Sequence, residues 1–136
     1  MHNGIIEIDG GSIGWFQNGE LHREDGPALL KISGTREWYL NGKKHRVDGP
    51  AQKWANGGRE WWLNGKRHRV DGPAVIQADG SRTWFVDGQV HRVDGPAFEG
   101  ANGRREWYLN GRKYTEEEFE QQLLVRRWGL SVDSSA

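Results

Sequence analysis

The sequence has no cysteine, which excludes a disulfide framework, a thiolate metal site and a cysteine nucleophile. It has no excess of charge either, because 19 Lys and Arg residues balance 19 Asp and Glu residues, so no net field attracts nucleic acid or an anionic membrane. No stretch approaches the roughly 18 apolar residues of a membrane span, and the start, MHNGIIEIDG, lacks the basic and apolar regions of a secretory signal. We therefore expect one soluble domain in a cytoplasm.

Proline is scarce, and its placement reveals a repeat. All four prolines occupy one column, and five tryptophans follow one another at intervals of 23 residues: Trp15, Trp38, Trp61, Trp84 and Trp107. A fixed period of this length predicts an array whose units bury surface against their neighbours.

Within each unit, short β-prone runs alternate with turn dipeptides. REWYL at 36–40 and AVI at 74–76 are examples, and Asn-Gly, Asp-Gly and Asp-Gly-Pro separate such runs. This pattern predicts a β meander with two strands per repeat, in which NGKRHRVDGP is a long connection and ADGS a tight hairpin. A third short strand, KRHR, is the alternative. Alternation places Trp38 and Leu40 on one face, expected to be the more buried, and Glu37 and Tyr39 on a half-exposed face.

The motifs NGKRH at 64–68 and ADGSR at 78–82, followed by an aromatic pair, resemble the MORN repeat, a 23-residue β-hairpin unit. The resemblance covers residues 5 to about 114, and the H-R-x-D-G-P-A variant is similar to a MORN-like subclass of phage and large-virus proteins. It implies a mainly β fold: an elongated, single-layer antiparallel meander of hairpin repeats that serves as a protein-binding scaffold without catalysis or cofactor.

The repeat pattern ends after residue 114, where TEEEFEQQLLVRRWGL predicts an amphipathic helix over 115–130. Thr115 and Glu118 have the spacing of a capping box, and Gly129 is a C-terminal stop. We expect the helix to cap the array around Trp107 and Leu109; docking in a partner's groove is the alternative. The predicted organisation is therefore a repeat array (1–114), a capping helix (115–130) and a disordered tail (131–136).

An H-x-x-D motif recurs in every full repeat and invites a metal or general-base interpretation. Adjacent copies should lie about 9–10 Å apart, too far for two histidines to share one ion. We therefore expect a structural role, in which a side-chain hydrogen bond closes the Asp-Gly-Pro turn, and predict no catalytic, cofactor-binding or metal-binding residue. The residues concerned are His22, Asp25, His45, Asp48, His68, Asp71, His91 and Asp94.

A ladder of arginines, Arg23, Arg46, Arg69 and Arg92, accompanies this motif. Such a ladder beside aromatic residues could bind single-stranded nucleic acid. Each arginine, however, lies two residues before an aspartate that could pair with it on the same face. We expect a self-compensating surface and regard nucleic acid as an unlikely partner.

The strand after each proline varies most between copies, and the column after each repeat tryptophan is always aromatic. Variable apolar groups at half-exposed positions are suited to a protein interface, although packing within the array is an equal alternative. The candidate protein-binding residues are Tyr39, Lys53, Trp54, Trp62, Phe85, Phe98 and Tyr108.

Together these patterns predict a non-enzymatic protein-binding module. The resemblance suggests a narrower hypothesis: a phage-encoded inhibitor that acts in the host cytoplasm on a bacterial defence complex such as a CRISPR effector. One alternative is an aromatic array for glycans or choline, because WYLNG is similar to choline- and glucan-binding repeats. Another is a self-assembling sheet or homodimer, formed through the open strand edge at residues 5–9.

Overall fold

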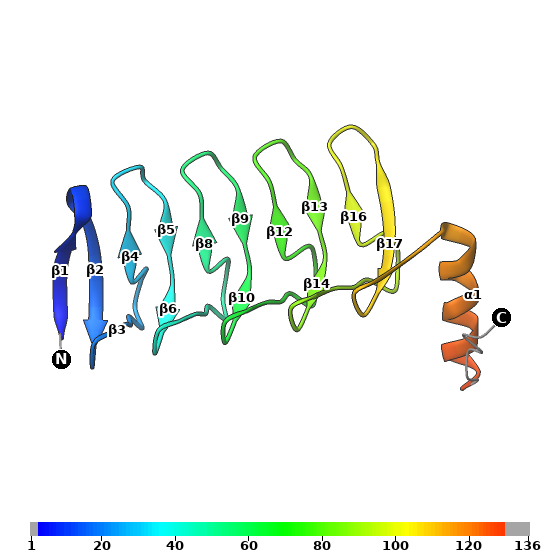
Figure 1. The fold of residues 1–136 in the computed structure, drawn as a ribbon, viewed down its shortest axis with the longest axis horizontal. Helices are drawn as coiled ribbons and strands as arrows, with labels where there is room; N and C mark the ends of the chain where they lie inside the picture. The colour runs from blue at the N-terminus through cyan, green and yellow to red at the C-terminus, as the bar shows by residue number, and fades with distance from the viewer. Residues whose placement is uncertain (1–2, 130–136) are drawn as a thin grey trace.

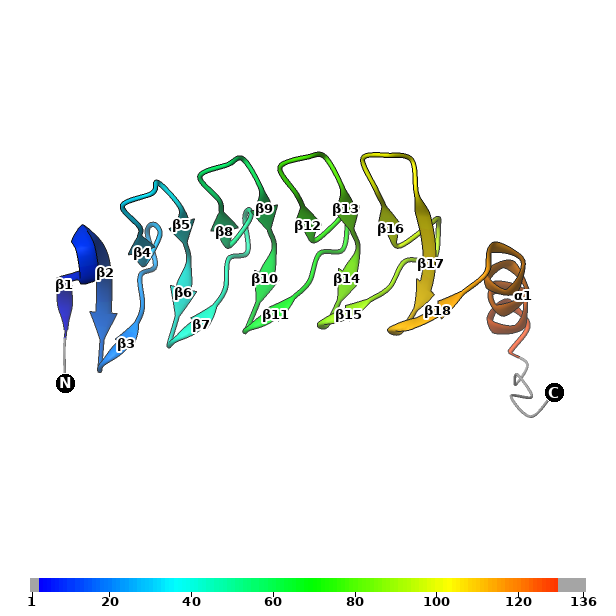
Figure 2. The ribbon, with the colours of Figure 1, turned by 45° about the horizontal axis from the view of Figure 1, so that its top comes forward.

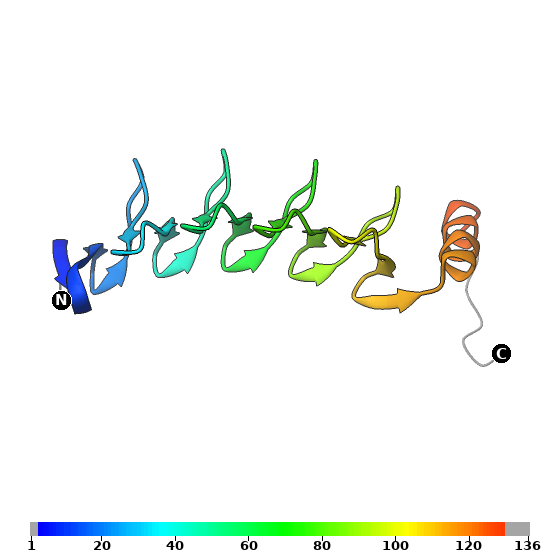
Figure 3. The same cartoon turned by 90° about the horizontal axis from the view of Figure 1, so that it is seen from above.

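The computed structural model describes residues 3–129, which form a row of β-hairpins extending from strand β1 to helix α1 (Figure 1). The row is a single layer of antiparallel hairpins, and its sheet is open. The predicted fold class, an elongated antiparallel meander with one C-terminal helix, is confirmed. The upper hairpins and the lower hairpins lean to opposite sides of the long axis (Figure 3).

The strands form one long sheet and three small ladders. The twelve-stranded sheet runs β1 (Gly4–Ile8), β2 (Ser12–Gln17), β4 (Leu29–Leu30), β5 (Arg36–Glu37), β8 (Gln52–Lys53), β9 (Arg59–Glu60), β12 (Val75–Ile76), β13 (Arg82–Thr83), β16 (Phe98–Glu99), β17 (Arg105–Leu109) and β18 (Arg112–Tyr114), with β3 (Glu20–Leu21) beside β2. The ladders are β6 (Tyr39–Leu40) with β7 (Lys43–Lys44), β10 (Trp62–Leu63) with β11 (Lys66–Arg67), and β14 (Phe85–Val86) with β15 (Gln89–Val90). A 3₁₀ turn, η1 (Asp9–Gly11), joins β1 to β2.

Each repeat contains more strand segments than the two that we favoured. The alternative third strand exists, but it is limited to the first two residues of KRHR, as in β11. The long connection is therefore shorter than predicted, because its Asn-Gly pair already turns the chain into a lower hairpin (Figure 2). Asn64 and Gly65 both have positive φ, 49° and 82°, as in the two-residue turn that matches strand twist.

The repeat tryptophan divides each long strand, because its backbone bonds to two different neighbours. The N–H of Trp61 donates to the carbonyl of Ala74 in the next repeat at 2.7 Å, and its carbonyl accepts from His68 of its own lower hairpin at 3.1 Å. Above this residue the strand pairs in the main sheet, and below it the strand pairs within β10–β11. The tryptophan column thus marks where the sheet splits.

Most of the fully buried apolar positions are alanines, and within the Trp and Leu stripe, which we expected to be the more buried, Leu109 is fully buried. The alanines after the four prolines, Ala28, Ala51, Ala74 and Ala97, are each 0% exposed, whereas the repeat tryptophans are half-buried. Glu37 and Glu60, expected on a half-exposed face, are buried. A single-layer sheet has no second layer to cover large side chains, so away from helix α1 the buried groups are those enclosed by neighbouring strands.

Helix α1 (Glu116–Arg127) ends the array. Thr115 Oγ1 accepts from the backbone N–H of Glu118 at 3.1 Å, and the Glu118 carboxylate accepts from the N–H of Thr115 at 2.8 Å, which confirms the capping box. The chain leaves the helix through Gly129, at φ +70°. The helix packs against β17 and β18, where Leu109 and Phe119 are buried, while Leu124 is exposed. The tail predicted at 131–136 lies outside the described residues.

Candidate protein-binding surface

An arginine lying over a tryptophan holds each Asp-Gly-Pro loop. The guanidinium of Arg46 lies 4.1 Å from the ring centroid of Trp38 and donates to the Asp48 carboxylate and to the Pro50 carbonyl, both at 3.1 Å. A Cβ built on Gly49 would lie 3.0 Å from Arg46 Cζ, which explains glycine before the proline. The other three loops repeat the arrangement with Arg23 on Trp15, Arg69 on Trp61 and Arg92 on Trp84. The predicted pairing of each arginine with its aspartate is confirmed.

The histidines have a different role from the one we predicted. His45 Nδ1 accepts from the backbone N–H of Asn64 at 2.9 Å, so its bond reaches the next repeat and does not close its own turn. His22, His68 and His91 make the same contact with the residue 19 positions further on. An accepting Nδ1 assigns the proton of the neutral ring to Nε2. The histidine therefore ties adjacent repeats together, while the arginine holds the turn.

Successive loops enclose three equivalent hollows on the face that carries the repeat tryptophans, which we call the groove face. The central hollow, about 670 Å³, has Trp61 and Leu63 as its floor and the loops 46–49 and 68–71 as its walls. Its neighbours, about 630 and 640 Å³, have Trp38 with Leu40 and Trp84 with Val86 as floors. Adjacent hollows share one loop as a common wall, so together they form a continuous corrugated groove along the array.

An exposed valine stands on three of the four loops that wall the hollows. Val47, Val70 and Val93 are 81%, 88% and 52% exposed, and Glu24 takes this position in the first loop. The aspartates of the loops are also exposed. This surface was missed in the sequence, although an apolar column within an otherwise polar loop, R-V-D-G, was a signal for it.

A row of mainly basic residues lies on the same face as the hollows. Sheet register aligns Arg36, Lys53, Arg59, Arg82 and Arg105 across neighbouring strands, with Ile76 and Glu99 between them. Lys53 Nζ lies 5.7 Å from the Trp38 ring and Arg82 lies 5.9 Å from the Trp84 ring, which places this row on the groove face. The groove face thus has exposed carboxylates on its loops and a mainly basic row on its strands.

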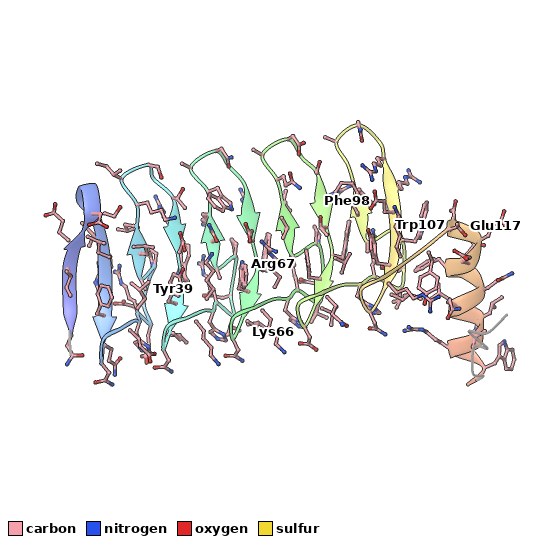
Figure 4. The ribbon with its side chains drawn as sticks, in the orientation of Figure 1. Tyr39, Lys66, Arg67, Phe98, Trp107 and Glu117 are labelled. Carbon is pink, nitrogen blue, oxygen red and sulfur yellow. The ribbon has the colours of Figure 1, made fainter. Side chains whose placement is uncertain are left out.

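The other face, which we call the aromatic face, is organised by buried carboxylates. Glu60 accepts from the indole N–H of Trp54 at 2.8 Å, from that of Trp62 at 3.0 Å and from Arg67 Nε at 3.1 Å. Arg67, which is labelled in Figure 4, also lies 4.9 Å from the centroid of the Trp62 ring and 5.5 Å from that of the Phe85 ring. Most polar groups of this face are therefore engaged with one another.

Burial and hydrogen bonding compete at these carboxylates. Burial alone would raise the pKa of Glu37, but hydrogen bonds from Tyr39 and Lys31 and the charge of Lys44 outweigh it and hold the pKa below its ordinary value. Burial, and then the bond to Glu37, raise the pKa of Tyr39. Glu37 is therefore an anion within the sheet that keeps its neighbours in place.

The predicted contact residues divide between the two faces. Tyr39, Trp54, Trp62, Phe85, Phe98 and Tyr108 share the aromatic face with the buried glutamates, and Lys53 lies on the groove face. Trp54 is the most exposed of them and borders a hollow of about 450 Å³ with Asn56 and Val75. Their role in binding stays a prediction.

Within residues 3–129, no group of three or more His, Asp or Glu side chains could hold a metal ion. No helix in this part of the chain is long and apolar enough to cross a membrane. Comparison with models of protein families and with curated proteins finds no match to this chain.

Proposed function

We propose that the chain is a non-enzymatic protein-binding module. The observation that carries the proposal is the row of exposed valines beside equivalent hollows on the groove face. Exposed apolar side chains held on rigid loops bind a partner at low cost in ordering, because the arginine clamps and histidine links already fix the loops.

A glycan or choline array is less well supported. Sugars and quaternary ammonium groups bind to open aromatic ring faces. Here Arg69 lies 3.8 Å from the Trp61 ring centroid, and Lys44 and Arg67 lie 5.0 and 4.9 Å from the Trp62 ring centroid. The array's own cations thus occupy the ring faces that such ligands need.

A capture experiment with the full chain tests this function. Immobilised wild type is compared in a bacterial lysate with Val70→Asp on the groove, with Trp54→Ser on the aromatic face, and with Ile32→Asp, a matched control at an exposed hairpin tip. We expect a protein retained by the wild type and the control and lost with one of the two surface variants. Retention of nothing, or equal retention by all four proteins, would contradict the proposal.

The narrower proposal is that this partner is a bacterial defence complex, such as a CRISPR effector, bound in the host cytoplasm by a phage-encoded inhibitor. Its support is the resemblance to phage repeats. Expression of the chain in a bacterium with an active CRISPR system should restore plating of a targeted phage, and Val70→Asp or Trp54→Ser should abolish the effect. Unchanged plating would contradict this narrower form alone.

A further inference from the structure

The hollows of the groove face recur at a defined interval, which restricts what can occupy them together. Each repeat contributes two strands to the main sheet, and neighbouring strands lie about 4.7–4.9 Å apart, so the hollows recur about every 9.4–9.8 Å. A linear partner fills consecutive hollows only if its side chains recur at this interval.

Three regular chain conformations can be compared with this interval. A polyproline II helix returns to the same face every three residues, about 9.3 Å. A β-strand presents side chains on one face about every 6.6–6.8 Å, and two turns of an α-helix advance about 10.8 Å. Over the two steps between three hollows, the polyproline II chain drifts by about 1 Å or less, whereas an α-helix drifts by more than about 2 Å.

The hydrogen-bonding groups of the groove match the same conformation. Polyproline II leaves its backbone carbonyls unpaired, so its partner must supply donors. Among the described residues, no partner accepts from the indole N–H groups of Trp38, Trp61 and Trp84, and none of these nitrogens is sealed from solvent. Each hollow is therefore lined by one tryptophan whose indole N–H has no acceptor among the described residues.

Charge distinguishes one end of the groove from the other. Its first wall has the adjacent carboxylates Glu24 and Asp25, both exposed, where the later walls have a valine and an aspartate. Asp25 is already paired with Arg23, so Glu24 is the additional negative charge of this wall, and a basic residue at the matching end of a ligand would lie over it.

We propose that the groove binds a proline-rich segment in the polyproline II conformation, with an apolar side chain at every third position and a Lys or Arg over Glu24. This proposal rests on the protein-binding function and specifies its partner. Three hollows accommodate three apolar side chains, and the valine walls contact the residues between them.

Two synthetic peptides of equal composition test the proposal. KPLPPLPPLPK has leucine at every third position and lysine at both ends, and KPLPLPPPLPK shifts one leucine out of that register. Titration of the full chain, followed by tryptophan fluorescence and by polarisation of labelled peptide, should show at least about tenfold tighter binding of the first peptide, the effect of one leucine losing its hollow. Val70→Asp should lose this preference, while Ile32→Asp should keep it.

Equal binding of the two peptides, absence of binding, or displacement of the first peptide by a single-stranded oligonucleotide would overturn the proposal. The lysate experiment distinguishes failure of this proposal from failure of the proposed protein-binding function. If the peptides fail but a captured protein still depends on Val70, the groove binds another conformation and the protein-binding function stands. If capture fails too, both proposals fall.

Discussion

The guanidinium of each loop arginine combines three roles that a lysine could not fill together. It lies over an indole, donates through Nε to a carboxylate and donates through a terminal nitrogen to a carbonyl four residues on, as Arg69 does with Trp61, Asp71 and Pro73. The planar fork of arginine matches this geometry, whereas an ammonium is a point charge.

Replacement of Arg69 by lysine should therefore destabilise the protein by about 1–2 kcal/mol, through loss of the stacking and of the bond to the Pro73 carbonyl. Urea unfolding followed by circular dichroism would measure the change. Arg59→Lys, in the exposed basic row, is the control and should stay within about 0.5 kcal/mol of wild type. Equal effects of the two substitutions would contradict the clamp.

At the histidines, the acceptor role predicts a dependence on pH. Burial, and then the charge of Arg126, lower the pKa of His91, whose Nδ1 accepts from the Asn110 N–H at 2.9 Å. The unfolded chain therefore takes up this proton at higher pH than the folded one. The stabilising effect of His91 is complete above the unfolded pKa of about 6.5 and is lost as pH falls below it.

Melting temperatures between pH 7.5 and 5.5 would measure this loss. His91→Asn is a matched variant, because an amide oxygen can replace Nδ1 as the acceptor but does not titrate. We expect the variant to melt near the wild type at pH 7.5 and to lose less stability at pH 5.5. Parallel pH profiles for the two proteins would refute a titrating link at this position.

Structural elements whose geometry depends on a few adjacent residues could be predicted from the sequence. Those whose geometry depends on contacts with the next repeat could not. Asn64-Gly65 and the capping box of Thr115 and Glu118 were predicted because a few adjacent residues decide their geometry. The division of each strand at its tryptophan was missed, because it follows from a backbone bond to the next repeat, such as Trp61 N–H to Ala74. The buried alanines were missed for the same reason.

The next prediction concerns the packing of helix α1 against the end of the array. Phe119, 4% exposed, faces the end of the array where Leu109 is buried, so Phe119→Ala should destabilise the protein by about 3 kcal/mol. Leu124→Ala, on the exposed side of the helix, should stay within about 0.5 kcal/mol. Thermal unfolding of both variants makes the comparison.

Deletion of residues 115–136 extends the same test to the whole helix. If the helix caps the array, its deletion should cause a large loss of thermal stability or solubility. A truncated protein that melts like the full chain but no longer retains its partner would instead support a helix that docks on that partner.

At the scale of the whole molecule, the two ends of the array differ. Helix α1 covers one end, whereas within residues 3–129 β1 pairs only with β2 and its other edge is open, with Ile5 65% exposed. Open, apolar strand edges pair with other strands.

We therefore expect light scattering to show a molar mass that rises with protein concentration. Ile5→Lys places a charge on the edge and should keep the protein monomeric, while Ile32→Lys, at a hairpin tip that is 79% exposed, should associate like the wild type. A wild type that is monomeric at every concentration would rule out pairing through β1.

The candidate site was less predictable than the fold. The aromatic residues were selected because their types are common at interfaces, yet Tyr39 and Tyr108 each donate to a glutamate two residues before them. The groove depends on how far one loop stands from the next, a distance set by the sheet. A single repeat contains one wall of a hollow and part of its floor, so no pattern within one repeat could define it.

The uniform spacing of the tryptophans has a consequence for how such a chain can change. The histidine link joins residues 19 positions apart in all four copies, as His45 to Asn64 and His68 to Asp87 show. Duplication or loss of a whole 23-residue segment by recombination would therefore recreate the same junctions at the new boundary. The groove would gain or lose one hollow at each event, so ligands of different length could be accommodated without any new interface having to evolve.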